Sequence, residues 1–136
     1  MELKMAALSH FLNLDLVLRS NSDLGALVKH LDPQRVLVLS DQEFEGQFLL
    51  VLELTGKEEP AHDAQWCTQQ FLTIIDEFPD AVLHIWKGCT SRTFSYGFEG
   101  GCDFPALDTT ITADLLLRIG QVGADIGITV YPHQPD

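Results

Sequence analysis

The feature of this sequence that most restricts its fold is the order in which two hydrophobic periodicities follow one another. Residues 12–19 place leucine at every second position, which is typical of a strand with one buried face. A helical spacing of apolar residues follows in 24–31, and Asp32 with Pro33 ends it. Segments of these two kinds alternate along the rest of the chain. The alternation predicts an α+β domain.

The predicted elements have the order βαββαββαβ. Strands are predicted at 12–19, 36–39, 48–54, 81–87, 92–98 and 124–131, and helices at 24–31, from near Pro60 to Phe78, and at 112–122. The first six elements correspond to the ferredoxin-like βαββαβ core, and the C-terminal βαβ extends the same sheet. Three helices are too few to cover both faces of six strands. We therefore expect a two-layer sandwich, with a mostly antiparallel six-stranded sheet, three helices on one face and the second face open.

The chain is long enough for one hydrophobic core. It has 136 residues, and no segment rich in Pro, Gly or Ser divides it, so 1–136 is predicted to be a single domain. Strands 36–39 and 48–54 are apolar on both faces. An open sheet face would then expose apolar surface, and a homodimer through that face is one arrangement that would cover it.

Two segments resemble a family of small bacterial domains of unknown function. One is the run LLLRIGQVGADIGITVY, which starts at Leu115 and is similar to the C-terminal end of the family pattern. The other is Leu31-Asp32-Pro33, which resembles the stop after the family's first helix. The resemblance implies an α+β sandwich. It carries no catalytic residue onto this chain.

Charge and composition exclude some functions. Twenty Asp and Glu against eight Lys and Arg give a net charge of −12, which disfavours binding to nucleic acid. No uncharged apolar stretch reaches the length of about 18 residues that a membrane span needs. The three cysteines are an odd number without paired short spacing, which is typical of reduced thiols in the cytoplasm. We expect a cytoplasmic protein without membrane attachment.

No catalytic or metal-binding spacing stands out. The potential zinc ligands lack any Cys-x-x-Cys or paired His pattern, and they are His62, His84, Cys89, Cys102 and Asp103. A thiol nucleophile at Cys89 or Cys102 with His84 as base would make the chain an enzyme of unrecognised type, but acidic neighbours of Cys102 raise the pKa of a thiol. The sequence predicts no catalytic residue, metal or cofactor.

Acidic side chains near aromatic ones point to protein binding. Carboxylates cluster in 41–45, 58–63 and 99–108, and such clusters with aromatic anchors can attract and hold a basic protein surface. The predicted partner-binding residues are Asp41, Glu43, Glu45, Trp86, Tyr96, Glu99, Asp103 and Phe104. The leading hypothesis is a non-catalytic acidic domain that binds a basic partner, in its narrowest form an immunity protein that occludes a toxin. Ordinary surface charge with buried rings is the competing interpretation. A small-molecule-binding module that uses the open sheet face and the 99–111 loop is the alternative.

Overall fold

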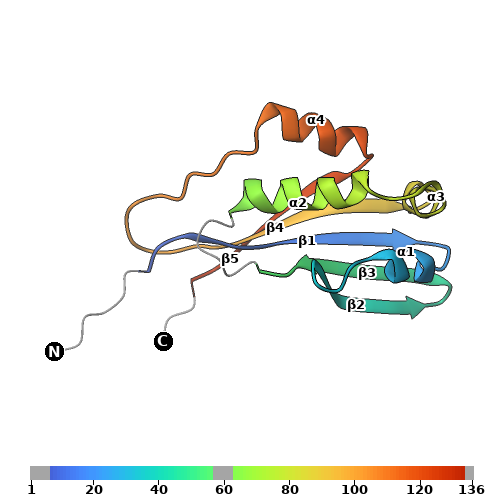
Figure 1. Ribbon diagram of the computed structural model, residues 1–136. Helices are drawn as coiled ribbons and strands as arrows, with labels where there is room; N and C mark the ends of the chain where they lie inside the picture. Colours follow the sequence, from blue (N-terminus) through green and yellow to red (C-terminus); the bar gives the residue numbers. More distant parts are fainter. Residues whose placement is uncertain (1–6, 57–62, 134–136) are drawn as a thin grey trace.

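The computed structural model describes residues 7–56 and 63–133 as one mixed sheet with helices packed on it (Figure 1). The elements in chain order are β1 (His10–Ser20), α1 (Gly25–His30), β2 (Val36–Phe44), β3 (Gln47–Leu54), α2 (Ala64–Asp76), α3 (Asp80–Lys87), β4 (Ser91–Glu99), α4 (Ala113–Gln121) and β5 (Asp125–Tyr131). The predicted start of a helix near Pro60, and the acidic Glu58 and Glu59, lie outside the described residues.

The sheet has five strands in the order β2-β3-β1-β4-β5. Pairs β2–β3, β3–β1 and β1–β4 are antiparallel, whereas β4 and β5 are parallel and are joined through α4. β3 lies between β1 and β2, which therefore run in the same direction. This topology leaves β2 and β5 as the two edges of the sheet, on opposite sides of the molecule.

The hydrophobic core lies between the sheet and the helices. Figure 1 shows α2, α3 and α4 on one face of the sheet, and α1 packs beside α3. The sheet contributes alternate buried side chains, namely Leu14, Leu16, Leu18, Leu50, Leu52, Leu54, Phe94 and Tyr96. The ring of Phe71 on α2 meets that of Phe94 at 6.1 Å between centroids. The expected α+β sandwich with helices on one face is present.

The predicted sheet of six strands with three helices, arranged as a ferredoxin-like core plus a βαβ extension, is wrong. The structure has five strands and four helices, because residues predicted as strand 81–87 form helix α3. Pro79 occupies the N-cap position, Asp80 carries negative charge in the first turn, and Gly88 follows at the C-cap. Val82 and Trp86 are buried whereas His84 between them is exposed; in a strand all three would lie on one face, so this burial fits the helical period.

The helix-free face of the sheet has a polar centre. The Nδ2 of Asn13 donates to Asp15 Oδ1 at 3.0 Å and to Glu53 Oε2 at 3.1 Å. Asp15 and Glu53 are direct cross-strand neighbours, and the shared donor offsets the repulsion between the two carboxylates. The exposed apolar side chains of the sheet lie largely on its two edge strands, at Leu37, Val38, Leu39, Phe44, Ile126, Ile128, Val130 and Tyr131. The register places Leu37 beside Glu53, on the helix-free face.

Among the helices that the structure describes, none is long and apolar enough to cross a membrane.

Candidate functional site

The first group of predicted partner-binding residues lies at the tip of the β2–β3 hairpin. Glu45 and Gly46 both have positive φ, at 52° and 78°, which is the backbone of a two-residue turn between twisted strands. Asp41, Glu43 and Glu45 are exposed there, and Phe44 between them is 76 % exposed. The tip therefore combines negative charge with one protruding ring.

The second group lies at the opposite end of the sheet. Glu99 ends β4 and its Oε2 pairs with His10 Nε2 at 3.2 Å. Asp103 Oδ2 accepts the backbone N–H of Ala7 at 2.6 Å, and Phe104 is 94 % exposed. The hairpin tip is beside the start of β4, so the nine residues of that strand separate the two groups. The separation is about 30 Å. The structure thus places the predicted carboxylates at two distant positions and not in one cluster.

Trp86 and Tyr96, which are predicted to contact a partner, have rings that belong to the core. Trp86 is 1 % exposed and its indole N–H donates to the carbonyl of Val122 at 2.9 Å. Tyr96 is 3 % exposed, and its hydroxyl lies 2.6 Å from Thr68 Oγ1 on α2. Burial also raises the pKa of Tyr96. An aromatic residue can lie in the core or on the surface, and the elements that pack around it determine which.

The buried cysteines are poor nucleophiles. Burial, with Asp63 and Glu53 adding to it, raises the pKa of Cys67 from 9.0 to about 11. Burial also raises the pKa of Cys89, although the nearby Arg92 lowers it in part. A thiol that holds its proton at neutral pH reacts slowly. Cys102 is exposed, and within the described part of the chain no three His, Cys, Asp or Glu side chains are grouped to hold a metal ion.

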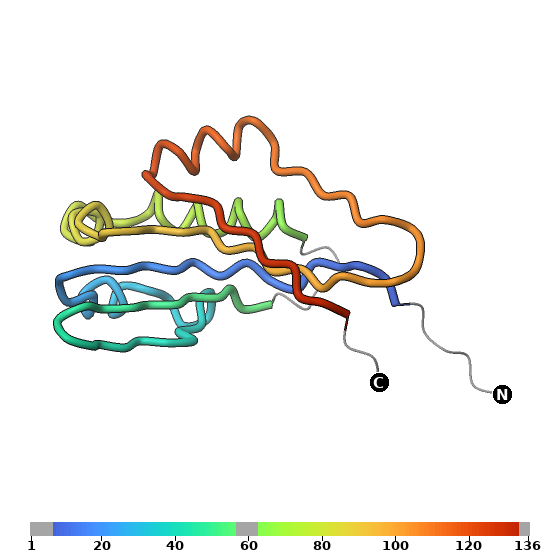
Figure 2. Tube along the Cα trace, turned by 180° about the vertical axis from the view of Figure 1, so that it is seen from behind, coloured from blue at the N-terminus to red at the C-terminus, as the bar shows by residue number. Residues whose placement is uncertain are grey.

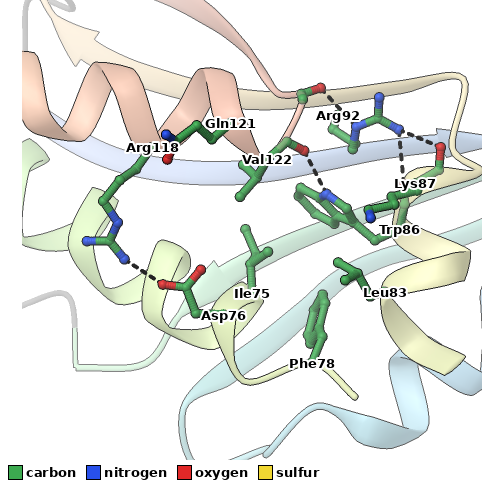
Figure 3. Close-up of a pocket in the computed structure, with 11 residues that line it drawn as sticks. Ile75, Asp76, Phe78, Leu83, Trp86, Lys87, Arg92, Arg118, Gln121 and Val122 are labelled. Carbon is green, nitrogen blue, oxygen red and sulfur yellow. Dashed lines mark hydrogen bonds and ion pairs between the residues drawn. The ribbon is translucent and has the colours of Figure 1, made fainter. Parts of the chain in front are cut away.

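A cavity of about 540 Å³ lies between α2, α3 and α4 (Figure 3). Its lining combines apolar and charged side chains from Ile75, Asp76, Phe78, Leu83, Trp86, Lys87, Arg92, Arg118, Gln121, Val122 and Gly123. Sequence reasoning missed this site, because its residues come from segments far apart in the chain. Three of the eight basic residues of this acidic chain gather in its wall.

Two of those three basic side chains are already engaged. Arg118 Nη2 bonds to Asp76 Oδ2 at 2.9 Å and joins α4 to α2. Arg92 donates to the carbonyls of Trp86, Cys89 and Gly123 at 2.9 to 3.0 Å, as Figure 3 shows in part. These carbonyls lie at the C-terminal ends of α3 and α4, where the helix dipoles are negative. Arg92 thus links the ends of α3 and α4, and most of its N–H groups donate to their carbonyls.

The edge strand β5 contains none of the residues that the sequence predicts to bind a partner. Its Ile128 is 68 % exposed and its Val130 is 63 % exposed, although apolar and other residues alternate in 124–131 and both belong to the apolar set. The register places them beside Tyr96 and Phe98, on the side of the sheet that carries the helices. We call Ile126, Ile128 and Val130 the β5 edge surface. Only the alternation in 124–131 hinted at it, and alternation does not distinguish an edge strand from a central one.

Carboxylates lie near the two ends of β5, on the opposite face of the sheet from the side chains of the β5 edge surface. Asp125 begins β5, and Glu99 is the register partner of Tyr131 at its other end. The N–H of Gly100 then bonds to the carbonyl of Tyr131, so the start of the 100–112 segment is tied to this strand. An edge strand with aliphatic side chains on one face and carboxylates on the other is suited to binding a partner that is apolar toward the first face and basic toward the second.

Comparison of the chain with protein-family models, curated proteins and solved structures gives no match.

Proposed function

We propose that this chain is a non-catalytic acidic domain that binds a basic protein, and that the β5 edge surface is the centre of its binding site. The observation that carries the proposal is the exposure of Ile128 and Val130 on an edge strand. Natural proteins usually protect such strands with charge, proline or a covering segment. An exposed aliphatic edge bordered by carboxylates therefore favours an interaction surface over ordinary solvent contact.

The narrowest form of the proposal is an immunity protein that occludes a basic toxin. Carboxylates would steer the toxin through its positive field, and the exposed aliphatic side chains would supply buried area in the complex. The compartment that suits this role is the cytoplasm, which agrees with the free state of Cys67, Cys89 and Cys102. The acidic 99–108 segment starts at the carboxyl end of β5, where Glu99 and Gly100 lie beside Tyr131, and it would extend the contact.

The test uses two sets of carboxylates, one beside the β5 edge of the sheet and the other at the β2–β3 hairpin on the opposite edge. Basic proteins encoded beside the gene are titrated against the wild type by calorimetry, with lysozyme as an unrelated basic protein. We expect one of them to bind much more tightly than lysozyme. Glu99→Gln, Asp108→Asn and Asp125→Asn together should weaken that complex by about tenfold, since rim charges act mainly through long-range attraction.

The matched control replaces Asp41, Glu43 and Glu45 at the hairpin tip by Asn, Gln and Gln. It removes the same charge from the opposite edge of the sheet and should change the affinity by about twofold at most. If no neighbouring gene product binds better than lysozyme, or if both triple variants weaken the complex equally, the proposal is wrong.

A small-molecule-binding module is the second candidate, and the cavity between α2, α3 and α4 is the observation that favours it. Its volume of about 540 Å³ lies within the usual range for ligand pockets. Lys87 in its wall forms no ion pair with another described residue. A metabolite library should then raise the melting temperature of the wild type and have less effect on Lys87→Gln.

A further inference from the structure

The backbone of β5 has one free edge, and the structure shows which residues form it. The N–H of Gly100 donates to the carbonyl of Tyr131 at 2.8 Å, so the backbone of Tyr131 points toward β4. Backbone polar groups of successive strand residues point to opposite sides. Gly127 and Thr129 therefore face β4 as Tyr131 does. The N–H and C=O groups of the β5 edge surface point away from β4, where the described part of the chain provides no strand.

The free backbone groups and the exposed side chains belong to the same residues. Ile126, Ile128 and Val130 are 41 %, 68 % and 63 % exposed. Figure 2, seen from behind, brings this strand to the front of the molecule. A strand laid along it would make backbone hydrogen bonds and would place its own alternate side chains beside three aliphatic ones.

The other edge of the sheet is less suitable for such pairing. β2 has an irregular register between Val38 and Ser40, and Asp41 and Glu43 follow in its second half. Bulges and charges on an edge strand hinder pairing with another chain. β5 has a continuous register with β4 and carries no charge or proline from Ile126 to Tyr131. The two edges therefore differ in their readiness to accept a strand.

Charge selects the kind of strand that would bind. Its residues on the helix-free side would lie next to Asp125, whose side chain is exposed at the start of β5, and near the acidic end of β4 at Glu99. The chain as a whole has a charge of −12. Lys or Arg at those positions would be attracted. A second copy of β5 would instead provide Gly127 and Thr129 there and would bring two strongly negative molecules together.

We infer that the partner adds an extended segment to β5 as a sixth strand, and that this segment alternates aliphatic residues with Lys or Arg. The inference rests on the proposed function and names its mode of binding. The aliphatic residues of the segment face the α4 side of the sheet, and the basic residues face the helix-free side.

The experiment measures amide hydrogen exchange in the full chain by NMR, with a capped seven-residue peptide that alternates isoleucine and lysine. Without peptide, the amides of Ile126, Ile128 and Val130 should exchange much faster than those of Gly127 and Thr129, because only the latter point toward β4. A saturating amount of peptide should slow exchange at the first three by about tenfold or more. A peptide with glutamate in place of lysine should give no slowing.

A pair of variants isolates the backbone contribution. Ile128→Pro removes one outward donor and leaves the β4 side of the strand intact, whereas Ile128→Thr removes apolar area and keeps the donor. Proline should weaken peptide binding by about tenfold relative to threonine. Slow exchange at Gly127 and Thr129 confirms that β5 of each variant is still paired. A peptide N-methylated along one edge tests the same hydrogen bonds on the wild-type protein, and it should not bind.

Three results would overturn the inference. One is saturation with the lysine peptide without protection of the outward amides, and another is equal binding of the glutamate peptide. The third is a dimeric solution mass of the wild type that Ile128→Pro abolishes, since this would assign β5 to a second copy. If a neighbouring basic protein binds while the outward amides stay unprotected, only the mode of binding is wrong and the proposed function stands.

Discussion

Buried polar groups set the chemistry of single residues in this molecule. Tyr96 and Thr68 share a hydrogen bond of 2.6 Å, and Thr68 Oγ1 also donates to the carbonyl of Ala64 at 2.7 Å. Two polar side chains are thereby satisfied inside the core. Cys67 lies on the same helix and is 2 % exposed, with Asp63 and Glu53 close enough to oppose its ionisation. Its thiol is a packing group whose ionisation is coupled to folding.

The raised pKa of Cys67 predicts a loss of stability in alkali. The folded state holds the thiol proton up to a pKa of about 11, whereas the unfolded chain releases it near 9.0. The free energy of unfolding should therefore be unaffected by this group below pH 9 and should fall as pH rises to 11, by about 2 kcal/mol in total. Urea unfolding from pH 8 to 11 measures the slope.

Cys67→Ala is the control, since alanine cannot ionise. The variant should start from a lower stability and lose less of it between pH 9 and 11, because Tyr96 and Cys89 titrate in both proteins. Parallel pH profiles for the two proteins would contradict the assignment.

At the same scale, the sequence predicted the chemistry of side chains better than their positions. Asp41, Glu43 and Glu45 are exposed as expected, because charged residues are seldom buried without a partner. An aromatic side chain has no such preference for the surface, so its residue type does not predict its exposure. Trp86 is buried, and the carbonyl of Val122, 36 positions later in the chain, accepts its indole N–H. That contact depends on tertiary structure, which no local pattern contains.

Among the elements, the ends of α3 and α4 depend on one side chain from β4. Arg92 donates to carbonyls at both helix ends, and Gly123, with a φ of 74°, allows the chain to turn beside the guanidinium. This contact joins the sheet to two helices near the cavity (Figure 3). It matters for stability because it satisfies carbonyl groups that helix ends leave without partners.

Arg92→Met should therefore destabilise the fold by about 2–3 kcal/mol, because several charge-assisted hydrogen bonds are lost while the length of the side chain is kept. Chemical denaturation measures the change. The matched control is Arg35→Met, which removes an exposed ion pair with Glu77 and should cost below about 1 kcal/mol. Equal losses for the two variants would show that Arg92 is no more than a surface cation.

The sequence also predicted elements unequally. The strand at 12–19 and the helix ending near Phe78 correspond to β1 and α2, because their periodicities extend over many residues. Seven of the eight residues of α3, 81–87, were predicted to form a strand. A short segment contains too few periods to separate 2 from 3.6, and the capping residues at its ends were the better signal. This one error changed the strand count and the topology.

The whole molecule carries its negative charge at several separate places. The hairpin tip, the centre of the helix-free face and the 99–108 segment each contain carboxylates, whereas Lys87, Arg92 and Arg118 gather at one cavity. Composition indicated that the net charge is negative, but it did not indicate where the charged side chains lie. The β5 edge surface was equally hidden, because its exposure follows from the strand order of the sheet and not from its own residues.

A net charge of −12 should make the folded state sensitive to ionic strength. Sodium chloride screens repulsion among the carboxylates, so the melting temperature should rise by several degrees, about 3–6 °C, between 10 and 300 mM salt. Calorimetry measures it. The variant that neutralises Asp41, Glu43 and Glu45 should melt higher at low salt and gain less from added salt. A melting temperature that falls with salt would mean that favourable ion pairs outweigh the repulsion.

The unlike edges of the sheet also bear on solubility in a crowded cell. If β2 of one molecule accepted β5 of the next, each addition would expose a fresh β5, and the array would lengthen without limit, since nothing in such a head-to-tail contact closes it into a ring. The irregularity after Val38 and the acids at Asp41 and Glu43 obstruct that route to fibres. The hairpin carboxylates would then prevent polymerisation, a role that requires no partner protein.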